Sequence, residues 1–213
     1  MASIKHFRSQ WLEREVRHFV IALGGGILVG AVALVLVPEG IDQLPQPFVA
    51  TAILLAGGLA FMGLGRYQAK RKVSAPQFTA MAADFLPESL ALGGMFAVNA
   101  EGAALLALLI GMQNLPEGFN AWQELVGQRA RPAKVLGLVI LLALLGPVCG
   151  VVGWFWLAGH GAALGAILLF AAGGILYLTF QDIAPQSRLE RHWTPALGAV
   201  LGFGFALIGH LLL

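Results

Sequence analysis

The sequence has 213 residues, of which 58% are hydrophobic and only 11% are charged, and its formal net charge is +2. Its mean hydropathy is +0.81. A soluble domain typically carries about 25% charged residues, so this composition excludes a soluble globular protein and indicates a protein with several membrane spans. The length suits about seven helices of roughly 20 residues each, with no room for a soluble domain. We therefore expect an all-α, polytopic membrane bundle.

The first 17 residues differ from the rest of the chain. Basic residues fall on one side of a predicted helix and apolar residues on the other: Lys5, Arg8, Arg14 and Arg17 against Ile4, Phe7, Trp11, Leu12 and Val16. This pattern is typical of a helix that lies on the membrane surface. We expect residues 1–17 to form a cytoplasmic amphipathic segment and residues 18–213 to form one transmembrane domain.

Seven apolar runs follow, and each is long enough to span a bilayer. Their ranges are 18–38, 47–66, 74–98, 101–126, 133–158, 161–182 and 194–213. Pro76 and Pro195 fit the first turn of a helix, whereas Pro38 and Pro185 predict helix ends.

The basic residues predict the orientation. All thirteen Lys and Arg residues lie in the N-terminal segment or in the connections after the second, fourth and sixth spans. With seven spans these segments share one side of the membrane, so the positive-inside rule places the N-terminus in the cytoplasm and the C-terminus outside. We expect a multi-pass protein of the cytoplasmic (inner) membrane.

The chain also repeats itself. Residues 24–66 and 171–213 both open on a Gly-rich run, reach a proline and continue into a second Gly-rich helix. With seven spans the two segments enter the membrane from opposite sides. They therefore predict an inverted repeat, which is common in transporters whose substrate site lies near the midplane.

Two similar segments on the third and fourth spans carry polar groups at membrane depth. They are residues 84–89, Asp-Phe-Leu-Pro-Glu-Ser, and residues 113–118, Gln-Asn-Leu-Pro-Glu-Gly. In each segment a polar residue and a glutamate four positions apart share one helix face. Ionisable groups at this depth are costly unless they face a protein interior, a cavity or an ion. The residues expected to converge on one site are Asp84, Glu88, Gln113 and Glu117.

Three crowded carboxylates repel one another in a low dielectric unless a cation or shared protons neutralise them. A divalent cation compensates best, and a protonated, purely structural cluster is the alternative. Pro87 and Pro116 also free backbone carbonyls one turn earlier. Neither segment contains a histidine, so the ligands are oxygens, which favours hard ions such as Mn, Mg or Fe(II) and leaves Zn open.

Other polar residues have two interpretations each. Asn114 could ligate a cation or hydrogen-bond between helices. Asn120 and Glu124 could form an exit path or a solvated helix end. The acidic residues at span ends, for which a vestibule role is the minor alternative, are Glu39, Asp42 and Asp182.

Residues 113–118 resemble the His-Asn-x-Pro-Glu-Gly signature of the ZIP family of metal transporters, with Gln in first place, and residues 84–89 resemble its degenerate twin. The ranges 24–40, 47–66 and 161–213 resemble other family helices, and the family's first helix is missing. The resemblance implies an eight-helix fold arranged three, two, three, with a binuclear centre and movement of divalent transition metals toward the cytosol. It assigns Asp84, Glu88, Gln113 and Glu117 to a primary metal site, and Asn114 with the two glutamates to a secondary one.

The sequence departs from the family pattern at three positions. Asp84 and Phe85 stand where His and Asn are usual, and Gly146 stands where the sixth helix often has Glu. Because neither phenylalanine nor glycine has a ligating side chain, we expect a single-metal or altered site.

Our leading hypothesis is a transporter of divalent metal ions such as Zn, Mn, Fe or Cd, driven by an ion gradient or by downhill flow. The metal is substrate, no organic cofactor or nucleic acid is expected, and the partners are the lipid bilayer and, as an open option, a second copy of the chain. The alternative is a transport-inactive relative that binds metal or a partner protein. An enzyme is not favoured, because the chain lacks His-Glu-x-x-His and a clear nucleophile with a paired base.

Overall fold

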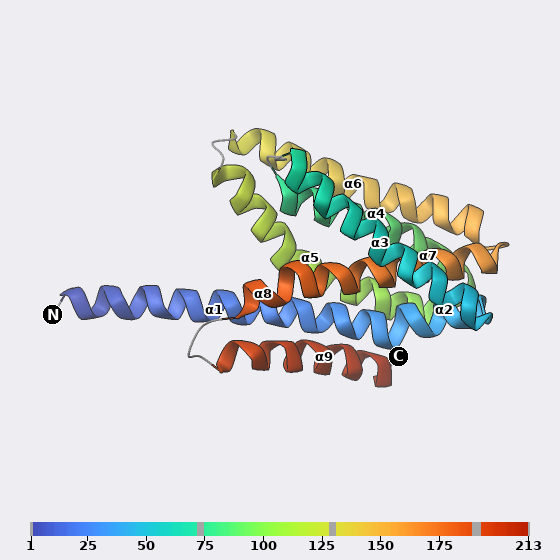
Figure 1. The fold of residues 1–213 in the computed structure, drawn as a ribbon, viewed down its shortest axis with the longest axis horizontal. Coiled ribbons are helices and arrows are strands. Elements are labelled where there is room, and N and C mark those ends of the chain that lie inside the picture. Colours follow the sequence, from blue (N-terminus) through green and yellow to red (C-terminus); the bar gives the residue numbers. More distant parts are fainter. Residues whose placement is uncertain (1, 72–74, 128–130, 189–192, 213) are drawn as a thin grey trace.

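The computed structural model describes residues 2–71, 75–127, 131–188 and 193–212, with side chains from residue 15 onward. Within these ranges the chain is helical and contains no β-strand, and its long helices lie side by side as a bundle (Figure 1). The helices are α1 (Ala2–Ala31), α2 (Val37–Gln43), α3 (Pro47–Arg71), α4 (Pro76–Val98), α5 (Ala100–Gly127), α6 (Pro132–Leu157), α7 (Gly161–Leu178), α8 (Ala184–Ser187) and α9 (Thr194–Leu212).

Two π-helical segments join these helices without a break. Val32–Leu36 connects α1 to α2, and Thr179–Ile183 connects α7 to α8. Directly after them, Pro38 and Pro185 lie in the first turns of α2 and α8. The prediction that these prolines end their helices is wrong. A proline ring clashes with the carbonyl one turn earlier in a regular α-helix, and the wider π turn ahead of each proline relieves that clash.

Six described helical segments are long and apolar enough to cross a membrane. They are Glu15–Gln43, Pro47–Arg71, Pro76–Val98, Pro132–Leu157, Gly161–Ser187 and Thr194–Leu212. The 28-residue α5 is not among them, because its polar residues between 113 and 124 lower its hydropathy. The seven-span count therefore stays a prediction.

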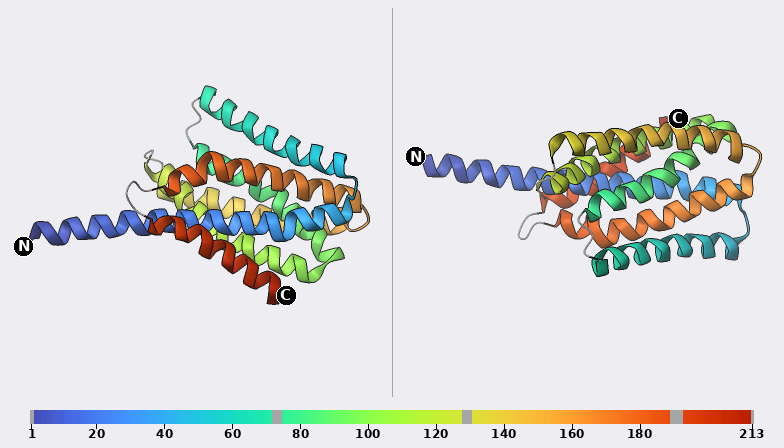
Figure 2. Two further views of the ribbon diagram at one scale, coloured as in Figure 1. Left: turned by 60° about the horizontal axis from the view of Figure 1, so that its bottom comes forward. Right: turned by 90° about the horizontal axis from the view of Figure 1, so that it is seen from above.

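The largest core cluster forms where α1, α4, α5 and α7 meet. Ile27, Met95, Leu109 and Leu168 are buried there. The more peripheral helices pack onto this core in pairs, α9 against α1, α3 against α7 and α6 against α4, and Figure 2 shows α3 and α9 on opposite sides of the bundle. Their outer faces are apolar and exposed, as a lipid-facing surface requires.

The helix α1 has no break at residue 17 or 18. It runs without interruption from Ala2 to Ala31, and its first part extends beyond the bundle (Figures 1 and 2). The amphipathic face expected for residues 1–17 involves mostly side chains outside the described set. A surface location for this segment therefore stays a prediction.

Candidate metal site

The helices α4 and α5 each contain an internal proline, Pro87 and Pro116. Because proline has no N–H, it cannot donate to the carbonyl one turn earlier, which belongs to Ala83 in α4 and to Met112 in α5. Both carbonyls lie directly beside the expected site residues in sequence. The two helices pack against each other in the bundle.

A pair of hydrogen bonds joins α4 to α5 at this level. Nε2 of Gln113 donates to both carboxylate oxygens of Glu88, each at 3.0 Å. Both side chains are 1% exposed. The structure thus brings together two residues, one from each proline segment, that the sequence predicted to converge.

The other two carboxyls of the expected site lie close to this pair. Asp84 is buried, and one of its oxygens accepts a hydrogen bond from the N–H of Phe85 at 2.9 Å. The charge on Asp84 interacts with those on Glu117 and Glu88, and Glu117 interacts with Glu88. Mutually repelling carboxylates in a low dielectric require a compensating cation or proton.

Two oxygens at this site have no hydrogen-bond partner. They are Oε1 of Gln113 and Oε2 of Glu117, and both atoms are buried. Buried polar atoms are normally satisfied, so an unpaired acceptor at such a depth is a candidate contact for a cation or a proton donor.

The present geometry is not a closed coordination shell. Among the described residues, no three His, Cys, Asp or Glu side chains lie close enough together to hold one metal ion. Gln113 directs its NH2 group, not its oxygen, at Glu88. Shared coordination would need the Gln113 amide to turn over and the carboxyls to close in. The assignment of these residues as ligands stays a prediction.

Asn114 behaves differently from its neighbour. Its Nδ2 donates to the carbonyl of Ile110 at 2.8 Å, one turn earlier in α5. The NH2 group is therefore engaged within its own helix and forms no bond between helices. Ligation through Oδ1 stays a prediction.

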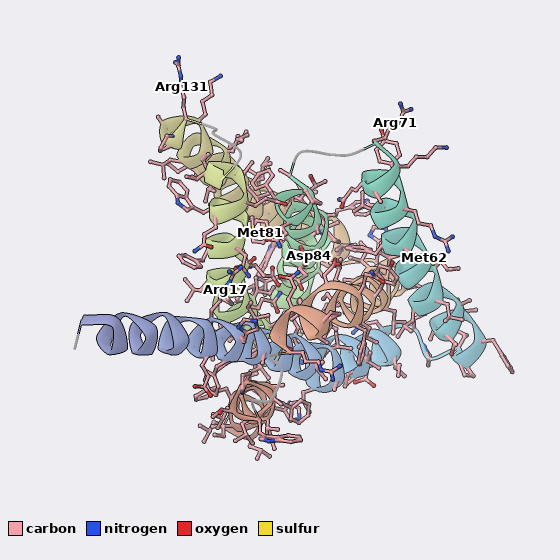
Figure 3. The ribbon with its side chains drawn as sticks, turned by 60° about the vertical axis from the view of Figure 1, so that its left-hand side comes forward. Arg17, Met62, Arg71, Met81, Asp84 and Arg131 are labelled. Carbon is pink, nitrogen blue, oxygen red and sulfur yellow. The ribbon has the colours of Figure 1, made fainter. Side chains whose placement is uncertain are left out.

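A cavity of about 900 Å³ reaches two of the site residues, Asp84 and Glu117. Figure 3 shows Asp84 and Met81 in the middle of the bundle, between α5 and α3. Glu88 and Gln113 are not among the lining residues and lie deeper. Polar residues that line the rest of the cavity are Arg66, Gln68, Gln77, Asn120, Glu124, Tyr177, Gln181, Asp182 and Gln186.

The acidic residues near the span ends differ in position, and Asp42 is not among the residues that line the cavity. Asp182 lines the cavity, as its vestibule interpretation requires. Glu124 also lines it, but its carboxylate accepts hydrogen bonds from the N–H groups of Gln77 and Phe78, so it caps the start of α4. Glu39 lies away from the cavity and accepts a hydrogen bond from Nδ2 of Asn99 at 2.5 Å.

No pattern in the sequence indicates the glutamines of the cavity. Gln68, Gln181 and Gln186 occur singly near span ends, where polar residues are common. They share one cavity because α3 packs against α7 and the helix continues through the π turn into α8. Only the pairing of helices in space could have identified them.

The fold and the site together define a polytopic helical membrane protein with an acidic site buried between two proline-containing helices. The sequence model of one family, described as ZIP Zinc transporter, matches residues 68–211, a range that includes both proline segments. Because this match covers more than half of the chain, the protein belongs to the ZIP family of membrane metal transporters. A comparison with curated proteins finds no match. Members of the family carry divalent metal ions as substrates and are transporters, not enzymes.

Proposed function

We propose that this protein moves divalent transition-metal ions across the cytoplasmic membrane through the site formed by Asp84, Glu88, Gln113 and Glu117. The observation that carries the proposal is the burial of two of three interacting carboxyls, Asp84 and Glu88, between α4 and α5, together with the buried, unpaired oxygens of Gln113 and Glu117. Oxygen ligands suit Mn, Fe(II) and Zn ions, and we propose the amide oxygen of Asn114 as a further ligand.

The cavity supplies a route to this site from one end of the bundle. Asp84 and Glu117 line it, and so do Gln77, Asn120 and Glu124, whose side chains carry oxygen atoms. An ion leaving the carboxyls can therefore stay in contact with polar side chains until it reaches the membrane surface. This avoids the cost of a bare charge in the hydrocarbon.

The basic residues support a cytoplasmic location for that end. The end of α3, the start of α4, the end of α5 and the starts of α6 and α9 all lie at the end of the bundle from which the N-terminus extends (Figure 1). Arg71 ends α3, Arg131 directly precedes α6, and Arg17 lies in the first part of α1. The positive-inside rule assigns this end to the cytoplasm, so the cavity opens inward and the C-terminus lies outside.

Matching glycine contacts support the inverted repeat. In each case a glycine lies so close to a backbone carbonyl of the neighbouring helix that a side chain would not fit. The contact of Gly57 with Phe170 matches the contact of Gly202 with Leu23. The contact of Gly173 with Leu54 matches the contact of Gly26 with Ala199. The residues of α1 and the corresponding residues of α7 differ in number by the same amount in both matches. The residues of α3 and α9 also differ by one constant amount. We propose that transport uses this symmetry, with the repeats moving around α4 and α5.

The test is metal uptake into proteoliposomes that contain the purified protein and a trapped metal-sensitive fluorophore. Wild-type protein should take up Mn(II), Zn(II) or Cd(II), and uptake should be lost in Glu88→Ala and in Glu117→Ala. Glu101→Ala is the matched control, because Glu101 is an exposed glutamate at the start of α5, the helix that carries Glu117. Wild-type rates in both site variants would show that the assigned site is wrong.

The second candidate function is a transport-inactive relative that binds metal or a partner protein. The observation that favours it is the loss of two ligand positions at Phe85 and Gly146. Metal binding that depends on Glu88, measured by calorimetry together with no flux in the proteoliposomes, would select this function over transport.

A further inference from the structure

Phe85 and Gly146 contact each other. They are the two departures from the family pattern that have no ligating side chain. A Cβ atom built on Gly146 would lie 2.6 Å from Cζ and 3.0 Å from Cε1 of the Phe85 ring. Atoms of that kind do not approach so closely, so the ring occupies the space that any side chain at position 146 would enter. The ring and the glycine fit each other as one unit.

The helices α6 and α4 approach each other closely beside this contact. Gly93 of α4 lies against the carbonyl of Gly150, and Gly153 of α6 lies against the carbonyl of Leu90, with no space for a side chain at either glycine. Two backbone contacts one turn apart fix the separation of the helices. The space between position 146 and α4 is therefore set by the backbone and filled by the ring.

Phe85 also separates two environments. Its neighbour Asp84 lines the polar cavity of about 900 Å³, whereas Phe85 lines a second pocket of about 520 Å³ between α4, α5 and α6. No described residue that lines this second pocket is charged, and Ser89 is one of its few polar members. The carboxyls are thus open to polar groups on the cavity side and closed by apolar groups on the α6 side.

We propose that the Phe85 ring, held against Gly146, limits the carboxylate site to one divalent cation per chain. The inference rests on the proposed function, because it concerns how many ions the same carboxyls hold. A second cation beside Glu88 and Glu117 on the α6 side would need oxygen ligands of its own. Phe85 and Gly146 offer no oxygen ligand, and the ring occupies the space where a water molecule could act as a ligand instead. The desolvation cost of a second ion is therefore not compensated.

The test measures the number of bound ions directly. Purified protein in detergent is equilibrated with Mn(II), the bound metal per chain is determined by elemental mass spectrometry, and the electron paramagnetic resonance spectrum reports whether two ions interact. The wild type should bind one Mn(II) with the spectrum of an isolated ion. The double variant Phe85→Asn/Gly146→Glu should bind two, with a spin-coupled spectrum, and Phe85→Leu should stay at one.

Because a glutamate at position 146 could disturb packing, Phe85→Asp is measured as a second variant that leaves the glycine unchanged. It should also gain an ion. Two ions in the wild type, both lost in Glu88→Ala, would overturn the limit set by Phe85 and leave the transport site intact. One ion in both gain variants, with helix content and particle size unchanged, would also overturn it. A wild type that binds no ion would instead overturn the proposed transport site itself.

Discussion

The Nε2 atom of Gln113 lies 3.0 Å from each carboxylate oxygen of Glu88 and donates to both. This contact ties α4 to α5 at the level where both helices are loosened by a proline. It also holds the buried carboxylate in one orientation. A hydrogen bond to a charged group contributes about 1.5–3 kcal/mol, and removing one partner leaves the other buried and unpaired.

Replacing Gln113 should therefore destabilise the protein through Glu88. We expect Gln113→Leu to lower the free energy of unfolding by about 1.5–3 kcal/mol, because the buried carboxylate loses its donor. The double variant Gln113→Leu/Glu88→Leu should recover most of this loss, since neither polar group is then left unpaired. Thermal unfolding of the detergent-solubilised protein, with divalent metal chelated, measures both changes.

Asn114→Ala provides the matched control for this cycle. Asn114 is the next residue in α5, and its Nδ2 donates to the carbonyl of Ile110 in the same helix. Its removal should cost about 0.5–1.5 kcal/mol and should not interact with substitution of Glu88. Equal losses in both single variants, with no rescue in the double variant, would mean that the link between Gln113 and Glu88 does not stabilise the fold.

The glycine contacts between α4 and α6 give a second prediction. A Cβ atom at Gly93 would overlap the carbonyl of Gly150, which is backbone and cannot rotate away. We expect Gly93→Ala to destabilise the protein by about 1–3 kcal/mol through overpacking. Gly137, on the exposed side of α6, has no neighbour within 4 Å of such a Cβ atom.

Gly137→Ala is therefore the control for Gly93→Ala, and its effect should have the opposite sign. Alanine is favoured over glycine in a helix by about 0.8–1.0 kcal/mol, so this change should be neutral or stabilising. Both variants are compared with wild type by thermal unfolding in the same detergent. Similar transition temperatures for the two variants would contradict a backbone contact at Gly93.

The spacing of residues in the sequence was sufficient to predict one contact between side chains of α4 and α5. A polar residue and a glutamate four positions apart must share a helix face, and two adjacent helices with the same pattern can join those faces. The contact between Glu88 and Gln113 follows from this rule. The helix bounds followed well from apolar length, with two kinds of exception: α1 continues through residue 18 without a break, and a π turn keeps the chain helical at Pro38 and Pro185.

Contacts that depend on the approach of two backbones could not be predicted in this way. The sequence showed Phe85 and Gly146 as separate departures from a pattern, and only the separation of α4 and α6 reveals that one fills the space left by the other. Glu124 likewise looked like a solvated helix end or an exit residue. Its role as a cap on α4 depends on where α5 ends relative to Gln77.

At the end of the bundle away from the start of α4, Asn99 makes two hydrogen bonds that can be separated by mutation. Its Oδ1 accepts from the N–H of Gly102 at 3.0 Å and caps the start of α5, and its Nδ2 donates to Oε1 of Glu39. We expect Asn99→Asp to keep the cap but to place a second carboxylate against Glu39. The expected loss is about 1.5–3 kcal/mol, measured by thermal unfolding.

Exchanging the amide at position 99 and the carboxylate at position 39 should restore the hydrogen bond between these side chains. In the double variant Asn99→Asp/Glu39→Gln, a glutamine amide at position 39 can donate to the new aspartate, so stability should return to near the wild-type value. Asn99→Ala should lose both hydrogen bonds. Its free energy of unfolding should be lower than that of Asn99→Asp by about 0.5–2 kcal/mol, because the cap is lost as well. If the exchange fails to rescue Asn99→Asp while Asn99→Ala is tolerated, then neither the cap nor the contact with Glu39 holds this end of the bundle together.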